Sequence, residues 1–318
     1  MGQQKPGHAY QPNCGLGCFT TMPKYTVVMP ARDANQTIEA AIRSVLASFP
    51  KDLQIVVWDD GSTDNTAEVA GQIDPRKILV MSSESSVGGG VARQRILASS
   101  DSEFVVNQDA DDISLPWRHR IQSSILVKAD FAFTGVRRFS DRKLFHRPSL
   151  PLPYTPKDAQ TALLLHNPLS HPSMVARRKA LDEIGGYSDT KVAQDYELWL
   201  RAVLHGKRLS RSGIPCLSYR LSSSQVSQQE DYSSRVLGNQ KLLNSYGNLA
   251  EKLIPAYRPR HEPIGTVEDL GHIDPCSIKQ LISNMSPTLR PYYRHLLQNR
   301  RLGYLSEAVI GDSRQIDA

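Results

Sequence analysis

From Tyr25 onward the chain alternates short β-rich runs with helical patterns, and this alternation constrains the fold more than any other feature. The run "YTVVMP" is followed by a helical pattern with Ile38, Ile42, Val45 and Phe49 on one face, and then by "LQIVVW". Such alternation is typical of right-handed βαβ units. We therefore predict an α/β fold with a mostly parallel central sheet flanked by helices. Further strands are expected at 77–81, 103–107 and 171–178, and further helices at 88–100, 157–166 and 193–206.

The pattern divides the chain into three parts. Residues 1–21 lack the apolar centre of a signal peptide, and Pro6 breaks the myristoylation pattern, so we predict a disordered extension with Met22 as a candidate start. Residues 22–222 carry the strand–helix alternation. Residues 223–318 carry mostly helical patterns, which predicts a helical C-terminal extension.

Charge and cysteine content narrow the class of protein only partly. A net charge of +6 favours anionic partners such as nucleotides, membranes or nucleic acid without selecting among them. The 4 cysteines are too few and too scattered for a disulfide framework in 318 residues, which indicates a reducing, cytoplasmic compartment. Cys14 and Cys18 have the spacing of half a zinc site, but no second pair follows, so we expect free thiols.

Acidic residues directly follow the second predicted strand in "VVWDDGSTDNT". Asp59 and Asp60 end the strand and Gly61 begins a turn. Turn chemistry and helix capping are one interpretation of this motif. The other is ligand binding, because a carboxylate at the carboxyl end of a parallel strand can accept hydrogen bonds from a base or a ribose.

Three glycines open the helix expected at 88–100. Free backbone N–H groups and the helix dipole favour phosphate there, and Arg93 and Arg95 add positive charge. A flexible turn is the alternative. The GxGxxG motif of dinucleotide-binding folds does not follow the first strand, so a dinucleotide fold is poorly supported.

Three aspartates follow the buried run "FVVN" in the motif "DADD". Asp109, Asp111 and Asp112 repel one another unless a positive charge lies among them. A Mg²⁺ or Mn²⁺ ion bridging Asp109 and Asp111 supplies that charge and also neutralises a diphosphate. A solvated loop that caps a helix beginning near Ser114 is the alternative.

These motifs share one edge of the predicted sheet, and with three others they resemble a known family. Residues 25–222 resemble the family 2 glycosyltransferases of GT-A fold in "VVMPARDANQTIEAAIRSVLAS", "IVVWDDGSTDNT", "GGGVARQRIL", "FVVNQDADD", "HPSMVARRKALDEIGGYSD" and "AQDYELWLR". The resemblance implies Asp195 as catalytic base and Asp109 and Asp111 as metal ligands. It also implies that a set of residues binds the nucleotide sugar, namely Pro30, Ala31, Arg32, Asp33, Asp59, Asp60, Gly61, Arg93, Asp109 and Ala110.

The chain departs from the family pattern at two positions. The family usually has Asn at the position of Asp33 and Glu at the position of Gln194. Asp195 could instead cap its helix, since carboxylates favour the first turn. His171 and Arg201 are lesser candidates for an acceptor pocket or a second metal site, and a hydrogen-bonding role beside a proline is the alternative for His171.

The leading hypothesis is therefore inverting transfer of a sugar from a nucleotide-sugar donor, UDP being favoured, to a hydroxyl of a glycan, a lipid-linked glycan or a protein. The processive-synthase pattern QxxRW is absent after Asp195, which favours single additions. Nucleotidyl transfer to a sugar phosphate is the enzymatic alternative, although no glycine-rich loop follows the first strand. Binding of nucleic acid is opposed by the acidic edge of the sheet. The basic segment 289–305 either contacts an anionic membrane or forms a solvated face packed on the catalytic domain. In the first case the protein would lie at the inner face of the membrane.

Overall fold

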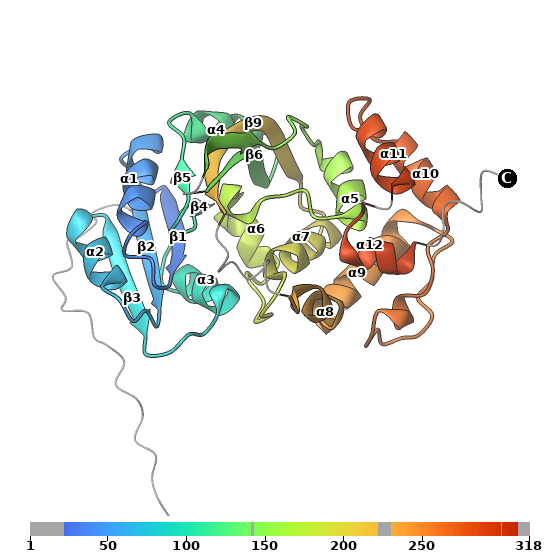
Figure 1. The fold of residues 1–318 in the computed structure, drawn as a ribbon, viewed down its shortest axis with the longest axis horizontal. Helices are drawn as coiled ribbons and strands as arrows, with labels where there is room; N and C mark the ends of the chain where they lie inside the picture. Colours follow the sequence, from blue (N-terminus) through green and yellow to red (C-terminus); the bar gives the residue numbers. More distant parts are fainter. Residues whose placement is uncertain (1–21, 141–142, 222–229, 300, 311–318) are drawn as a thin grey trace, which may run out of the picture.

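The computed structural model of the chain describes residues 22–140, 143–221, 230–299 and 301–310 (Figure 1). The extension 1–21, with Cys14 and Cys18, and the predicted boundary at 222 lie outside these residues. Within them, no helix is long and apolar enough to cross a membrane.

The first half of the fold is the predicted βαβ alternation. Its elements are β1 (Tyr25–Ala31), α1 (Ile38–Ser48), β2 (Leu53–Asp60), α2 (Thr66–Ile73), β3 (Ile78–Ser83), α3 (Gly89–Ala98) and β4 (Phe104–Asn107). The four strands pair in parallel in the order β3-β2-β1-β4. Alternate residues of β1 serve two cores, because Val27 and Met29 pack with α1 whereas Val28 packs with α3.

The sheet continues into strands that the sequence analysis did not predict. They are β5 (Ile113–Ser114), β6 (Phe131–Ser140), β7 (Lys143–Pro148) and β9 (Leu209–Arg220), joined to β4 through β8 (Val175–Arg177). The order is β3-β2-β1-β4-β8-β6-β9-β5, with β7 beside β6. β8 is antiparallel to both neighbours, whereas β6 and β9 run parallel. The α/β fold class is thus confirmed, with an additional mixed portion of the sheet.

One predicted helix start is wrong. Ser114 lies in β5 and pairs with Leu217 of β9, and the helix α4 spans Arg118–Leu126. Pro116 explains the delay, since a proline disfavours helical backbone in the residue before it.

The remaining elements are helical, namely α5 (Pro156–Leu165), the 3₁₀ turn η1 (His171–Ser173), α6 (Arg178–Glu183), α7 (Gln194–Leu204), α8 (Tyr232–Leu237), α9 (Gln240–Leu253), η3 (Glu268–Leu270), α10 (Pro275–Ser283), α11 (Arg290–Gln298) and α12 (Tyr304–Val309). The C-terminal helices α8 to α12 lie beyond α5 and α7, on the side of the molecule away from β1–β3 (Figure 1). A capping box fixes the start of α5, where Thr155 and Asp158 satisfy each other's backbone N–H groups.

The C-terminal helices share one hydrophobic core with α5 and α7. Tyr246 of α9 donates a hydrogen bond to the carbonyl of Leu164 at 2.8 Å, and the hydroxyls of Tyr293 and Tyr154 lie 3.1 Å apart. The helical character predicted for 223–318 is therefore present in its described residues, and these helices pack directly on the α/β core.

Candidate active site

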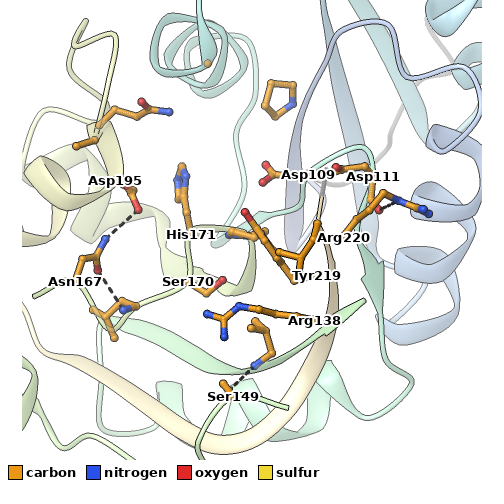
Figure 2. Close-up of a pocket in the computed structure, with 18 of the residues that line it drawn as sticks. Asp109, Asp111, Arg138, Ser149, Asn167, Ser170, His171, Asp195, Tyr219 and Arg220 are labelled. Carbon is orange, nitrogen blue, oxygen red and sulfur yellow. Dashed lines mark hydrogen bonds between the residues drawn. The ribbon is translucent and has the colours of Figure 1, made fainter. Parts of the chain in front are cut away.

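A cavity of about 1490 Å³ opens at the carboxyl ends of β1 and β4. Its walls come from the loop after β1, the "DAD" segment after β4, the starts of α3 and α7, the 166–172 segment, and the ends of β6 and β9. Figure 2 shows Asp195 and Asn167 on one side, Asp109 and Asp111 on the other, and Arg138 with Ser170 nearby. The sequence predicted this edge of the sheet, since ligands bind outside the carboxyl ends of strands in open α/β sheets.

Arg93 supplies the positive charge that the aspartate cluster needs. Its guanidinium donates to Asp109 Oδ1 at 2.6 Å and to Asn107 Oδ1 at 3.2 Å, and the side chain is buried. The glycine-rich start of α3 permits this approach, because a Cβ on Gly89 would lie 2.7 Å from the Arg93 guanidinium. A protein cation thus pairs with Asp109. Asp111 and Asp112 form no ion pair among the described residues, although Arg220 and Arg118 lower their respective pKa values from a greater distance.

Asp111 and Asp112 remain short of positive charge. Burial and the nearby charge of Asp109 raise the pKa of Asp111 to about 6, although Arg220 acts in the opposite direction. Asp112 Oδ1 accepts a hydrogen bond from the backbone N–H of Arg220 at 2.8 Å. Its buried Oδ2 has no hydrogen-bond partner among the described residues. Crowded, under-paired carboxylates of this kind fit a hard divalent cation.

Protein ligands for such a cation are few. Nowhere in the described ranges do three or more His, Cys, Asp or Glu side chains gather into a metal site. Asp109 and Asp111 as the metal ligands stay a prediction, and a Mg²⁺ ion there would take further oxygen ligands from a bound diphosphate.

The loop after β1 is clasped to the loop after β2. Asp33 lies in the left-handed region with φ 47°, its backbone N–H donates to Ser62 Oγ, and its carboxylate accepts from the backbone N–H of Thr63 at 2.8 Å. Asp and Asn are the non-glycine residues that adopt this conformation most readily. The departure from the family's usual Asn is therefore conformationally conservative. The predicted residues Pro30, Ala31, Arg32 and Asp33 all line the cavity.

Three predicted nucleotide contacts are absent from the cavity wall. Asp59 accepts a hydrogen bond from the backbone N–H of Ser62, and Asp60 accepts from the backbone N–H groups of Val87 and Gly88. Gly61 packs against the backbone of residues 85–86 with φ +72°. In this structure Asp59 and Asp60 hold the loops beside the cavity, because their carboxylates are turned toward backbone N–H groups. Gly61 allows the close packing of the same loops. Direct contact with a nucleotide stays a prediction for Asp59, Asp60 and Gly61.

Asp195 lies in the first turn of α7 and lines the cavity. Its Oδ2 accepts a hydrogen bond from Asn167 Nδ2 at 3.0 Å, and burial raises the pKa of its carboxyl group. Ala193, directly before the helix, has the strained left-handed φ of 51°. A carboxylate with a raised pKa in a cavity wall has the chemistry of a general base.

His171 and Arg201 have different outcomes. His171 lines the cavity but is buried, and its Nε2 lies 2.9 Å from the hydroxyl of Tyr187, as in the hydrogen-bonding alternative. Burial and then the charge of Arg93 hold its pKa well below the usual value, so the ring is neutral. Arg201 lies outside the cavity wall, because its guanidinium pairs with Glu197 at 2.8 Å and donates to the carbonyl of Gly186. A role for Arg201 in an acceptor pocket or a second metal site stays a prediction that this cavity does not support.

Sequence reasoning missed most polar residues of the far cavity wall, and four of them stand out. They are Arg138, Asn167, Tyr219 and Arg220. Each lies on β6, on β9 or in the segment before η1, outside the motifs at the ends of the first strands. No local pattern identifies them, since the crossing of distant strands brings them together.

An α/β sheet whose carboxyl edge carries opposed carboxylates around one large cavity fits an enzyme that binds a nucleotide-linked substrate there. The family comparison agrees. The model of glycosyl transferase family 2 matches residues 26–185, about half of the chain, and the chain belongs to this family. Membership sets aside the nucleotidyl-transfer and nucleic-acid interpretations.

Similar proteins are known in both sequence and structure. The chain is 26% identical over 209 residues to the Escherichia coli UDP-Glc:alpha-D-GlcNAc-diphosphoundecaprenol beta-1,3-glucosyltransferase WfgD, covering 64% of this chain and 80% of the relative. It is 26% identical over 195 residues to the putative glycosyltransferase EpsE of Bacillus subtilis, covering 58% of this chain and 69% of the relative.

The fold is shared with S. aureus TarS, whose residues 1–349 have been solved in complex with UDP-GlcNAc. The TM-score is 0.54 at 18% identity, and the match covers 86% of each chain. This share is larger than residues 22–222, so the likeness of fold extends into the C-terminal helices.

Proposed function

We propose that the protein transfers a sugar from a UDP-sugar to an acceptor hydroxyl with inversion at the anomeric carbon. The acceptor oxygen attacks that carbon, Asp195 takes the hydroxyl proton, and the bond to the UDP oxygen breaks. The observation that carries the proposal is the position of Asp195 in the same cavity as Asp109 and Asp111 (Figure 2). The UDP-GlcNAc complex of TarS and the UDP-Glc donor in the name of WfgD support the nucleotide.

The metal requirement is part of the same proposal. Asp109 and Asp111 would hold Mn²⁺ or Mg²⁺, which as a Lewis acid stabilises the departing diphosphate. Arg93, Gly89 and Arg220 surround this side of the cavity and contribute positive charge or free backbone N–H groups to the phosphates. The loop containing Arg32 and Asp33, together with Ala110, would contact the nucleoside.

The acceptor class that we favour is a lipid-linked glycan. Its support is the acceptor in the name of WfgD, GlcNAc-diphosphoundecaprenol. The protein would then work at the cytoplasmic face of a membrane and add one sugar per encounter. In the segment 289–305, α11 buries Tyr293, Leu296 and Leu297 against the rest of the protein, as in the packed-face interpretation. Peripheral contact of its basic face with an anionic membrane stays a prediction.

Replacing Asp195 with Asn tests the base. The change preserves size and removes proton acceptance, so UDP affinity should stay within about twofold while transfer falls by roughly 10²–10⁴-fold. Calorimetry with UDP and a transfer assay with UDP-glucose and UDP-GlcNAc measure the two properties. Asp189→Asn, which changes an exposed acid in the segment before α7, is the matched control. Near-normal turnover of Asp195→Asn would refute the role of base.

Removing a metal ligand tests the cation. Asp111→Asn should weaken UDP binding in Mn²⁺ by about tenfold or more, because charge-assisted ligation is lost. In EDTA the wild type and the variant should bind UDP equally weakly. Wild-type affinity that is insensitive to EDTA would exclude the cation from donor binding.

A further inference from the structure

One half of the cavity is basic. Its wall consists of the end of β6, the 149–154 segment and β9, and Figure 2 shows Arg138 from this wall reaching into the cavity toward Ser170. Arg138 and Arg211 both line it. Every carboxylate among the described residues that line the cavity comes from other elements; these are Asp33, Asp109, Asp111 and Asp195.

Arg138 has its guanidinium available for a ligand. Within the described residues it has no ion pair and donates no side-chain hydrogen bond, and it is exposed in the cavity wall. The preceding residue, Arg137, differs because its Nε donates to Ser218 Oγ at 2.7 Å. Successive side chains of a strand point to opposite faces, so the two arginines serve different surfaces.

Arg211 adds a second positive charge, and its guanidinium is tied to the wall itself. Its guanidinium donates to the carbonyl of Leu152 at 2.6 Å and to Ser149 Oγ at 3.1 Å, and it lies 5.4 Å from the centre of the Tyr154 ring. Arg211 therefore fixes the wall on which the cavity depends. Burial lowers its pKa, and the charge of Arg138 acts in the same direction. Two like charges that share a wall without an acid create a site that attracts an anion.

We propose that Arg138 is the centre of an anion subsite that binds a phosphoryl group of the acceptor, close to the hydroxyl that Asp195 deprotonates. This inference rests on the proposed function, because it takes the Asp195 side of the cavity as the place of transfer. A planar guanidinium matches two phosphate oxygens. Ser170, which Figure 2 shows beside Arg138, also lines the cavity, and its hydroxyl can donate to the same group.

The donor diphosphate is a poorer occupant of this subsite. We assign the phosphates of the donor to the opposite side of the cavity. Arg93 and Gly89 of α3 lie there, with the two predicted metal ligands in the segment after β4. Arg138 comes from β6. β9 reaches both sides, because Arg220 at its end donates from Nε to the carbonyl of Asp111 at 3.1 Å on the donor side. The acceptor phosphate would thus depend on Arg138 of β6, a strand that contributes none of its described residues to the donor side.

Binding measurements on the full chain test the subsite directly. Protein saturated with UDP and Mn²⁺ is titrated calorimetrically with N-acetylglucosamine 1-phosphate. Arg138→Gln should weaken this binding about tenfold or more, since a charge-assisted hydrogen bond is lost. The matched control Arg137→Gln should leave it unchanged, and both variants should keep the UDP affinity of the wild type within about twofold.

Other results would overturn the proposal. A loss of UDP affinity in Arg138→Gln would assign Arg138 to the donor. Equal binding of the sugar phosphate by Arg138→Gln and Arg137→Gln would show that Arg138 belongs to no anion site. Glucuronic acid that binds as tightly as the sugar phosphate would overturn the phosphoryl assignment. A wild-type chain that does not bind UDP would refute the proposed function instead, and the same titration without UDP would still test Arg138.

The source of the phosphoryl group is distinguished by a second probe. A short alkyl diphosphate ester of N-acetylglucosamine that binds more tightly than the 1-phosphate would identify a lipid-linked diphosphate as the ligand. Equal affinities would identify a free sugar phosphate. In either case the binding should depend on Arg138 and weaken as salt is raised, because exposed charges are screened.

Discussion

At the scale of single residues, the geometry of Asp195 depends on Asn167. The amide of Asn167 is held at both ends, since its Oδ1 accepts from the backbone N–H of Leu169 at 3.1 Å while its Nδ2 donates to Asp195. This hydrogen bond lowers the pKa of Asp195 against the larger, raising effect of burial. Asn167 is thus a positioning residue that also adjusts the basicity of the carboxylate.

Replacing Asn167 with Ala should separate these effects. Loss of the hydrogen bond removes an influence that lowers the pKa of Asp195, so the acidic limb of the pH profile of kcat/KM should move to higher pH, and turnover should fall roughly tenfold. A pH–rate series on the variant measures this, with the exposed Asn284→Ala as control. A reduced rate with an unmoved profile would make Asn167 merely structural.

The residues that sequence could predict are those in local motifs. Asp33, Asp109, Asp111 and Asp195 line the cavity because each follows or precedes a recognisable strand or helix. Arg138 and Asn167 carry no such signal. Their positions follow from how β6 and the segment before η1 cross the edge of the sheet, which is a property of tertiary packing.

At the scale of elements, the start of α3 is fixed by close packing. A Cβ on Gly90 would lie 2.8 Å from the carbonyl oxygen of Ser188, so the helix contacts the backbone of the segment before α7. This contact joins the phosphate side of the cavity to the Asp195 side. The sequence indicated glycine here for phosphate binding, and the structure adds a packing reason.

A pair of glycine substitutions tests that reason. Gly90→Ala should destabilise the fold by about 1–3 kcal/mol, because the added methyl overpacks a rigid backbone contact. Gly71→Ala in α2 should stabilise it by about 0.4–1 kcal/mol, since alanine is the better helix former and its Cβ would have ordinary contact, 3.7 Å from Val80. Urea unfolding of both variants provides the comparison. Stabilisation by Gly90→Ala would show that α3 can shift.

Strand prediction failed for β6 and β9 for an identifiable reason. β9 contains Gly213 and Pro215, which demote a strand in any propensity argument, and β6 contains Gly135. The register between the two strands shifts around Gly135, and a Cβ there would lie 2.8 Å from the carbonyl oxygen of Gly213. The glycines that weaken the strand signal in the sequence are therefore the residues that allow β6 and β9 to approach each other closely.

At the scale of the whole molecule, buried histidine makes stability depend on pH. The pKa of His171 is lowered on folding, so between its folded value and about 6.5 the unfolded chain binds more protons. This contribution to stability is present above about pH 6.5 and is lost as the pH falls. Asp111 acts in the opposite sense, because its pKa is raised to about 6 in the folded state.

His171→Gln isolates the histidine contribution, since glutamine can bond Tyr187 but does not titrate. Between pH 7.5 and 5.5 the free energy of unfolding of the wild type should fall relative to that of the variant by about 1.4 kcal/mol. Denaturant titrations of both proteins at both pH values measure this difference. The contributions of carboxylates such as Asp111 cancel, because they are the same in the wild type and the variant. Parallel pH curves would mean that folding leaves the pKa of His171 unchanged.

The final prediction concerns the C-terminal helices. Asp158 of α5 accepts hydrogen bonds from the backbone N–H and hydroxyl of Ser286 at 2.7 and 2.6 Å, and Tyr246 packs in the core against α5. Deleting residues 223–318 would expose the apolar faces of α5 and α7 and leave the Asp158 carboxylate short of partners, which costs more than the usual stability of a domain allows.

We therefore expect the chain truncated after residue 222 to aggregate or to lose its cooperative thermal transition. The chain beginning at Met22 should unfold at the same temperature as the full chain, because residues 1–21 have no periodic apolar face to bury. Light scattering and calorimetry on both truncations make the comparison. A soluble 22–222 fragment that unfolds cooperatively and binds UDP would show that the α/β core folds alone, and that the shared hydrophobic core adds stability without being required.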